Sequence, residues 1–275
     1  MNYSINVNGR LIETDTPRVM GILNVTPDSF FERSRVSGEE ELVERAQSML
    51  ADGADILDVG ACSTRPSGEP VSEEEELARL HAALDVLDKH FPSATVSVDT
   101  FRARVAQECA ELHNVAIIND VSGFEWDENM LHTVARLNLP YVLTHSAGWA
   151  GTPVEYDDFL PQVLASLAKK VWQLRQLGVK DVIVDPGFGF GKSVAQNYEM
   201  LSSLDAFAEL EAPLLVGLSR KSMITTLLGI SSGEALPETS ALNMAALLGG
   251  AHILRVHDVR EAANVVKMFM MLKGV

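Results

Sequence analysis

The sequence predicts an α/β protein, a (β/α)8 TIM barrel with a short N-terminal β-hairpin. Short apolar runs rich in β-branched residues alternate with longer amphipathic stretches, a pattern typical of a parallel sheet with crossover helices. Eight such repeats within 275 residues suit a closed barrel. The alternative is an open doubly wound sheet, which is less favoured because no Gly-x-Gly-x-x-Gly follows the first strand.

The N-terminal segment is expected to form the hairpin. Residues 3–7 and 11–12 are strand-like and flank Asn8-Gly9, a pair that suits a type I′ turn. We expect residues 1–17 to form this hairpin and to cover the bottom of the barrel, which residues 18–275 would build. No linker divides the chain, so a single domain is expected.

The eight predicted strands are short and apolar, with many Val and Ile residues. They span residues 19–25, 55–60, 95–99, 116–121, 140–144, 181–185, 213–218 and 253–256. Between them, apolar residues recur at helical spacing. The predicted helices span residues 39–51, 73–89, 102–112, 128–137, 157–177, 197–208, 222–228, 240–248 and 259–272.

Charge and composition exclude several classes of partner. The chain has 22 Lys and Arg against 38 Asp and Glu, a net charge of −16, which argues against nucleic acid and anionic membranes. The two cysteines, Cys62 and Cys109, form no Cys-x-x-Cys pair, which indicates a reducing compartment. No run approaches the roughly 18 apolar residues of a membrane span, and the first residues lack signal-peptide features. We therefore expect a cytoplasmic protein.

Every predicted strand ends in a polar residue, and in such barrels chemistry gathers at the C-terminal ends of the strands. A barrel without a site there would rarely show this at every strand. For Asp58 and Asp120, loop or helix capping remains an equal alternative. In chain order the strand-end residues are Asn24, Asp58, Asp99, Asn119 with Asp120, His145, Asp185, Ser219 with Lys221, and Arg255 with His257.

Four of these residues suit a flat heterocycle. Asp99, Asn119 and Asp185 supply acceptors and one amide, and Lys221 supplies a donor. A pterin has several N–H donors and a carbonyl group that match this set. Asp185 would accept two N–H bonds from the amino-pyrimidine edge, while Lys221 donates to the ring oxygen or a ring nitrogen.

Positive charge at the same end suits a phosphate. Strand alternation places Arg255 and His257 on one side of the last strand, where they form an anion-binding pair. Arg65, in the loop after the second strand, adds a further positive charge. Asn24 offers a neutral oxygen suited to a Mg²⁺ ion that keeps several waters.

Seven short motifs follow one another in an order that resembles the dihydropteroate synthases. The resemblance runs from about residue 20 to about residue 259. The motifs are NVTPDSF at 24–30, STRP at 63–66, SVDT at 97–100, INDVSG at 118–123, DPGFGFGK at 185–192, SRKS at 219–222 and RVHD at 255–258.

The resemblance implies a transferase of folate biosynthesis and the target of sulfonamides. Members of this family are barrels that condense 6-hydroxymethyl-7,8-dihydropterin pyrophosphate with p-aminobenzoate, by a substitution with carbocation character. It implies that Asp99, Lys221, Arg255 and His257 are catalytic and that the enzyme is a homodimer. The pterin would be held by Asp99, Asn119, Asp185 and Lys221, and pyrophosphate with Mg²⁺ by Asn24, Arg65, Arg255 and His257. The p-aminobenzoate would be framed by Thr64, Pro66, Phe190 and Ser222.

Three segments depart from the family pattern. Residues 31–34 are Phe-Glu-Arg-Ser where the family usually has Ser-Asp-Gly-Gly, so a stiffer first loop is expected. Residues 60–62 are Gly-Ala-Cys in place of Gly-Gly-Glu, and both loops complete the aminobenzoate pocket. Thr144 stands where a methionine usually packs against the pterin, which leaves a smaller apolar wall.

Two other functions remain open at this stage. A pterin-dependent methyltransferase domain would share the barrel, but it has no need of Arg65, Arg255 and His257 as a phosphate site, so the segments 219–221 and 255–257 argue against it. A catalytically silent pterin-binding paralogue would bind pterin without turnover. For assembly, the apolar residues Met244, Leu247 and Leu248, together with residues 222–228, are a candidate dimer surface.

Overall fold

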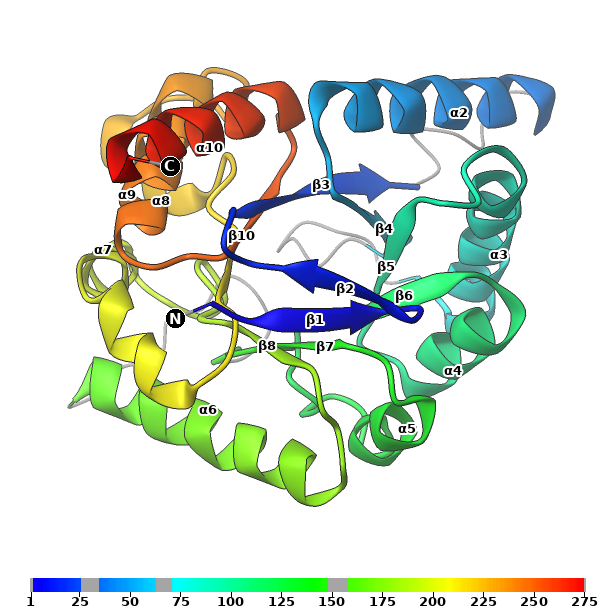
Figure 1. The fold of residues 1–275 in the computed structure, drawn as a ribbon, viewed down its shortest axis with the longest axis horizontal. Coiled ribbons are helices and arrows are strands. Elements are labelled where there is room, and N and C mark those ends of the chain that lie inside the picture. Colours follow the sequence, from blue (N-terminus) through cyan, green and yellow to red (C-terminus); the bar gives the residue numbers. More distant parts are fainter. Residues whose placement is uncertain (1, 26–34, 63–70, 148–157, 275) are drawn as a thin grey trace.

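The computed structural model describes residues 2–25, 35–62, 71–147 and 158–274 (Figure 1). It contains the predicted barrel. The barrel strands are β3 (Arg18–Asn24), β4 (Ile56–Gly60), β5 (Thr95–Asp99), β6 (Val115–Asp120), β7 (Tyr141–Thr144), β8 (Val182–Asp185), β9 (Leu215–Val216) and β10 (Ile253–Val256).

These eight strands are parallel and pair in the order β8-β7-β6-β5-β4-β3-β10-β9. A parallel bridge between Val184 and Leu214 joins the last strand of this order back to the first. The Val184 amide donates a hydrogen bond to the Pro213 carbonyl at 2.8 Å, so the barrel is closed. Strand β9 is shorter than the predicted 213–218, because its pairing with β10 is confined to Leu215 and Val216.

The helices form a ring outside the strands (Figure 1). They are α2 (Arg35–Asp52), α3 (Glu73–His90), α4 (Ala103–Leu112), α5 (Met130–Leu137), α6 (Phe159–Gln176), α7 (Val194–Ser202), α8 (Ser222–Leu228), α9 (Leu236–Leu248) and α10 (Val259–Lys273). Within the described residues, no helix combines the length and apolarity needed to span a membrane.

Three predicted helices differ from the structure. Helix α2 begins at Arg35 instead of residue 39. The single helix expected at 197–208 is the α-helix α7 followed by the 3₁₀ helix Leu204–Leu210. A capping box between Ser193 and Gln196 starts α7 three residues earlier than predicted. Helix α9 begins at Leu236 instead of residue 240, and Pro237 lies in its first turn, where proline is well tolerated.

The N-terminal hairpin closes the bottom of the barrel, as predicted. Its strands are β1 (Ser4–Val7) and β2 (Arg10–Glu13). Asn8 and Gly9 have φ values of 50° and 81°, the left-handed pair that a type I′ turn requires. The buried side chains of Ile5, Val7 and Ile12 join a cluster of residues inside the barrel. Figure 1 shows the hairpin lying across the barrel opening.

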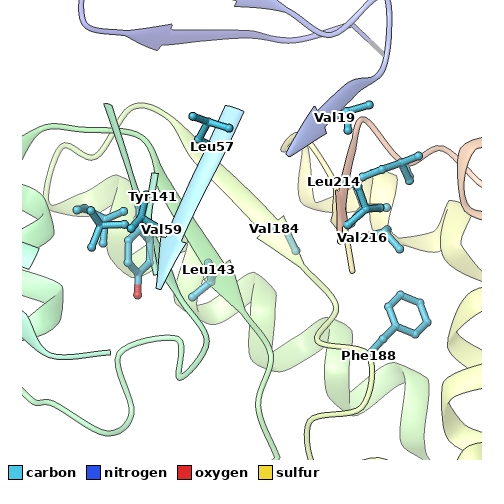
Figure 2. Close-up of a cluster of buried hydrophobic side chains, with 14 of the residues drawn as sticks. Val19, Leu57, Val59, Tyr141, Leu143, Val184, Phe188, Leu214 and Val216 are labelled. Atoms are coloured by element: carbon cyan, nitrogen blue, oxygen red, sulfur yellow. The ribbon is translucent and has the colours of Figure 1, made fainter. Parts of the chain in front are cut away.

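Strand alternation divides the apolar residues into two cores. Leu57 and Val59 belong to the larger core between strands and helices, part of which Figure 2 shows. Ile56, from the same strand, belongs to the smaller core inside the barrel. Because successive side chains of a strand point to opposite faces, Asp58 and Gly60 share the inward side with Ile56. The upper half of the barrel interior is therefore polar.

Candidate active site

Four strand-end residues lie at one level of the barrel. Register pairs Asn24 with Gly60, Gly60 with Asp99, and Asp99 with Asn119. Gly60 has no side chain at this level. A β-carbon there would lie 3.5 Å from Oδ2 of Asp99 and 3.6 Å from Oδ1 of Asn24. The oxygens of Asn24 and Asp99 therefore border one small space above Gly60.

Arg255 lies at the centre of a hydrogen-bonded network. Its Nε donates to Oδ2 of Asp58 at 2.6 Å, and its Nη2 donates to Oδ2 of Asp99 at 2.5 Å. Asn119 donates from Nδ2 to the same Asp58 oxygen at 3.0 Å. Asp58 is completely buried. One buried carboxylate thus fixes both Arg255 and Asn119, and Arg255 links them to Asp99.

Burial and charge set the protonation of this network. Burial raises the pKa of Asp99 to about 7, against the lowering effect of Arg255 and with a further rise from Asp58. Burial acts to lower the pKa of Arg255, but the carboxylates of Asp58 and Asp99 raise it above its ordinary value. Arg255 therefore stays protonated, whereas burial disfavours the charged form of Asp99 and Arg255 favours it.

A second charged pair, Asp185 and Lys221, faces the same interior. Burial raises the pKa of Asp185, opposed by Lys221 and by the Gly187 amide, which donates to Oδ1 of Asp185 at 2.8 Å. Burial lowers the pKa of Lys221 to about 8, opposed by Asp185. The Lys221 ammonium donates to the Phe188 carbonyl and lies 4.7 Å from the centre of the Phe190 ring.

The Arg255 network and the Asp185–Lys221 pair approach each other at Gly217. A β-carbon at Gly217 would lie 3.8 Å from Nζ of Lys221 and 3.8 Å from Cβ of Arg255. The absence of a side chain there keeps a space between the ammonium and the arginine. The same end of the barrel thus holds three carboxyl groups, two side-chain amides and two cations.

His257 is held from the neighbouring loop. Its Nδ1 lies 2.9 Å from Oγ of Ser219, which also accepts from the His257 amide at 3.2 Å. Between Ser219 and Lys221, the side chain of Arg220 is bound away from the barrel interior. Arg220 donates from Nε and Nη2 to the two carboxylate oxygens of Asp258, each at 2.8 Å. Arg220 thus ties the β9 loop to the end of β10 and adds no free charge for a phosphate.

Comparison with known proteins agrees with this geometry. A family model for pterin binding enzymes matches residues 20–257. The dihydropteroate synthase of Escherichia coli K12 is 38% identical over 265 residues, 94% of this chain and 93% of that protein. The Xanthomonas albilineans enzyme with 4-aminobenzoic acid superposes with a TM-score of 0.91 at 35% identity, over all of both chains. The Yersinia pestis enzyme in a sulfonamide complex gives a TM-score of 0.90 at 34% identity, over 99% of this chain and 100% of that one.

The chain belongs to the dihydropteroate synthase family of pterin-binding enzymes. Of the predicted site residues that it describes, the structure places Asn24, Asp99, Asn119, Asp185, Lys221 and Arg255 around one end of the barrel. Three predicted site residues, Thr64, Arg65 and Pro66, lie outside the described residues, as do the departures from the family pattern at 31–34. Phe190 lies beside Lys221, and Ser222 is the exposed first residue of α8.

The structure also separates the two aspartates whose role the sequence left open. Asp120 caps a turn: its Oδ1 accepts from the Ser122 amide at 2.8 Å, and its Oδ2 accepts from the Tyr141 hydroxyl at 2.6 Å. Asp58 instead belongs to the network that holds Arg255 and Asn119. The signal was present in the sequence, because Asp58 shares the inward parity of Ile56 and Gly60, but its partners come from distant strands.

Thr144, where the family usually has a methionine, is fully buried and pairs in register with Asp185. Its Cγ2 would lie 3.1 Å from a β-carbon at Gly187. The smaller side chain is therefore packed beneath the loop that follows β8.

Proposed function

We propose that this chain is an active dihydropteroate synthase, which condenses 6-hydroxymethyl-7,8-dihydropterin pyrophosphate with p-aminobenzoate to give 7,8-dihydropteroate and pyrophosphate. The observation that carries the proposal is the convergence of Asp99, Asn119, Asp185, Lys221 and Arg255 at one end of the barrel. Similar structures with 4-aminobenzoic acid and with a sulfonamide drug support the substrate class.

The pterin ring is proposed to lie between the two groups of polar residues. Asp185 accepts from the amino-pyrimidine edge, and Lys221 donates to the ring oxygen or a ring nitrogen. Asp99 and Asn119 approach the ring from the other side. All four side chains are held before substrate arrives, which lowers the entropy lost on binding. Buried charged partners also strengthen these bonds, because little water competes.

Pyrophosphate is proposed to bind beside Arg255 and His257, with Arg65 and Asn24 as further ligands. A Mg²⁺ ion at Asn24 is supported by the two oxygens, Oδ1 of Asn24 and Oδ2 of Asp99, that border the position above Gly60. No cluster of three or more His, Cys, Asp or Glu suited to a metal occurs in the described part of the chain. Mg²⁺ usually keeps several waters and takes few protein ligands, so such a cluster is not required.

The reaction breaks the bond between the pterin methylene carbon and the pyrophosphate oxygen. Arg255 and His257 stabilise the negative charge that develops on the leaving group. When bound, Mg²⁺ would supply further positive charge at this point. Nearby carboxylates, Asp99 among them, favour the positive charge that spreads from the carbon into the ring.

The amine of p-aminobenzoate then forms the new carbon–nitrogen bond and loses a proton. An aniline is uncharged at neutral pH, so no strong general base is needed and the protein mainly orients the reactants. Thr64, Pro66, Phe190 and Ser222 are proposed to frame the ring and carboxylate of p-aminobenzoate. A sulfonamide would occupy the same place.

The test is pyrophosphate release from purified protein given the dihydropterin pyrophosphate and Mg²⁺, with and without p-aminobenzoate. Release that requires p-aminobenzoate and yields dihydropteroate supports the proposal. Pterin binding without release would instead identify a silent paralogue. Lys221→Ala and Asp185→Ala should abolish turnover, whereas Lys169→Ala, at an exposed lysine of α6, should not. Near-normal activity of either site variant would overturn the pterin assignment.

We also propose that the protein is a homodimer formed through α8, α9 and α10, which Figure 1 shows grouped together. Three residues of α9 were predicted from the sequence to lie on the dimer surface. Of these, Leu247 is buried and Met244 packs against the core, but Leu248 is 58% exposed. The same group of helices exposes five more large apolar side chains, and an exposed apolar patch often marks a protein–protein contact. These are Leu227, Leu228, Met268, Met271 and Leu272.

Sedimentation equilibrium tests this assembly. Leu248→Glu should shift the protein toward monomer, whereas Leu112→Glu, at an exposed leucine on α4, should not. A monomeric wild-type protein would exclude the dimer.

The cytoplasm is the proposed compartment, because both cysteines, Cys62 and Cys109, are free thiols.

A further inference from the structure

Lys192 is a buried lysine whose three N–H donors are all used within the protein. Its side chain lies at the end of the loop 186–191, and the residue is 6% exposed. Nζ donates to the carbonyl oxygens of Gly187 at 2.8 Å, His145 at 2.9 Å and Phe190 at 3.1 Å. An ammonium group has three donors, so Lys192 has none left for a substrate.

The three carbonyls belong to two segments that lie against each other. His145 follows β7, whereas Gly187 and Phe190 belong to the loop after β8. Contact is so close that a β-carbon at Gly187, where φ is +73°, would lie 1.9 Å from the His145 carbonyl oxygen. Buried carbonyl groups need hydrogen-bond donors, and Lys192 supplies them to both segments at once.

The loop that Lys192 holds also holds the pterin-facing residues. The carbonyl of Phe188 accepts from the Lys221 ammonium, and the Phe190 ring lies beneath that ammonium. The Gly187 amide donates to Asp185. A shift of this loop would therefore displace Lys221 and Asp185 together, while the network around Arg255 comes from other strands.

We propose that Lys192 is a positioning residue for the dihydropterin substrate, and that it acts by fixing the loop 186–191 on which the placement of Lys221 and Asp185 depends. This inference rests on the proposed function. Lys192 does not contact the pterin itself. Its loss should therefore weaken binding of the pterin substrate more than binding of p-aminobenzoate. Two of the four residues proposed for the pterin, Lys221 and Asp185, depend on this loop, whereas Phe190 is the one residue proposed for p-aminobenzoate that belongs to it.

The experiment compares the wild-type enzyme with Lys192→Met, which keeps most of the side-chain volume and removes the ammonium. Lys169→Met, at an exposed lysine, is the control. Thermal unfolding first establishes that each variant is folded. We expect Lys192→Met to raise KM and Kd for the dihydropterin pyrophosphate about tenfold or more, as for the loss of hydrogen bonds to a charged group. The KM for p-aminobenzoate should rise by less, about twofold to threefold, the low end for one ordinary hydrogen bond, because Phe190 loses its donor.

Unchanged pterin binding, or equal changes for both substrates, would overturn the positioning role. If Lys192→Met does not fold, Lys192→Arg replaces it, because a guanidinium keeps the charge but displaces the donors. The same selective loss of pterin affinity would support the proposal, and an equal change for both substrates would overturn it. A wild-type protein that binds no pterin would overturn both the proposed function and this inference. Normal turnover by the wild type together with normal pterin binding by the Lys192 variant would overturn only the role of Lys192.

Discussion

Replacing Asp58 by alanine removes the carboxylate that Arg255 and Asn119 share. The carboxylate is completely buried and accepts from Arg255 at 2.6 Å and from Asn119 at 3.0 Å. The substitution would leave two buried donors without this acceptor, and each such group costs about 1–3 kcal/mol. Removing one partner of a buried ion pair costs about 3–5 kcal/mol. Because Arg255 keeps Asp99 as a partner, we expect the lower end, about 3 kcal/mol of unfolding free energy.

Urea unfolding followed by tryptophan fluorescence measures this loss. Asp58→Asn, which keeps an acceptor oxygen and the side-chain volume, should lose less than Asp58→Ala. Asp205→Ala, at an exposed position, should stay within about 0.5 kcal/mol of the wild type.

Steady-state kinetics should show how Asp58→Ala affects kcat/KM. With Asp58 removed, Arg255 is held only by Asp99, so both pterin and pyrophosphate contacts should loosen and kcat/KM should fall. A stable Asp58→Ala variant, within about 1 kcal/mol of wild type, with unchanged kcat/KM would refute the view that this carboxylate orients the site.

Further predictions concern the β8 loop, the hairpin and the response to acid. In urea unfolding, Gly187→Ala should lower the free energy of unfolding by more than Gly229→Ala. Both glycines have positive φ, but only Gly187 lacks space for a β-carbon, so equal losses of unfolding free energy would contradict this reasoning. Ile5→Ala should cost about 2–5 kcal/mol, whereas Leu11→Ala, at a residue 61% exposed, should cost little; a small loss at Ile5 would mean that the hairpin does not seal the barrel. Burial lowers the pKa of His145 to about 3, so between about pH 6.5 and that value the unfolded chain binds more protons and stability falls as pH falls. His145→Gln should make this fall shallower in urea titrations across the range, and an identical slope would exclude the effect.

The fold was predictable because its signals are local. Apolar runs with β-branched residues located all eight barrel strands, and Asn8-Gly9 located the hairpin turn. The errors were at element boundaries that depend on neighbours. Strand β9 is limited to Leu215 and Val216, the two residues that pair with β10. Helix α9 begins before its apolar pattern does, because Pro237 is tolerated in its first turn.

The site was predictable in part. Strand ends in a barrel meet at one end, so Asn24, Asp99 and Arg255 could be grouped before their contacts were known. Strand alternation could place Asp58 on the inward side, but its role could not be assigned, because its partners Arg255 and Asn119 come from distant strands. The contacts of Arg220 were likewise not predictable: it lies between Ser219 and Lys221 in the sequence, but its side chain binds Asp258.

The sequence by itself determined the order of strands and helices, the side of each strand that faces inward, and the chemical character of the strand ends. These are local properties, because strand alternation and helical spacing follow from the backbone of a single segment. Only the tertiary structure decided which strand ends touch. Arg255 and Asp58 are 197 residues apart in the chain. They meet because the barrel closes, and closure depends on the packing of all eight strands at once.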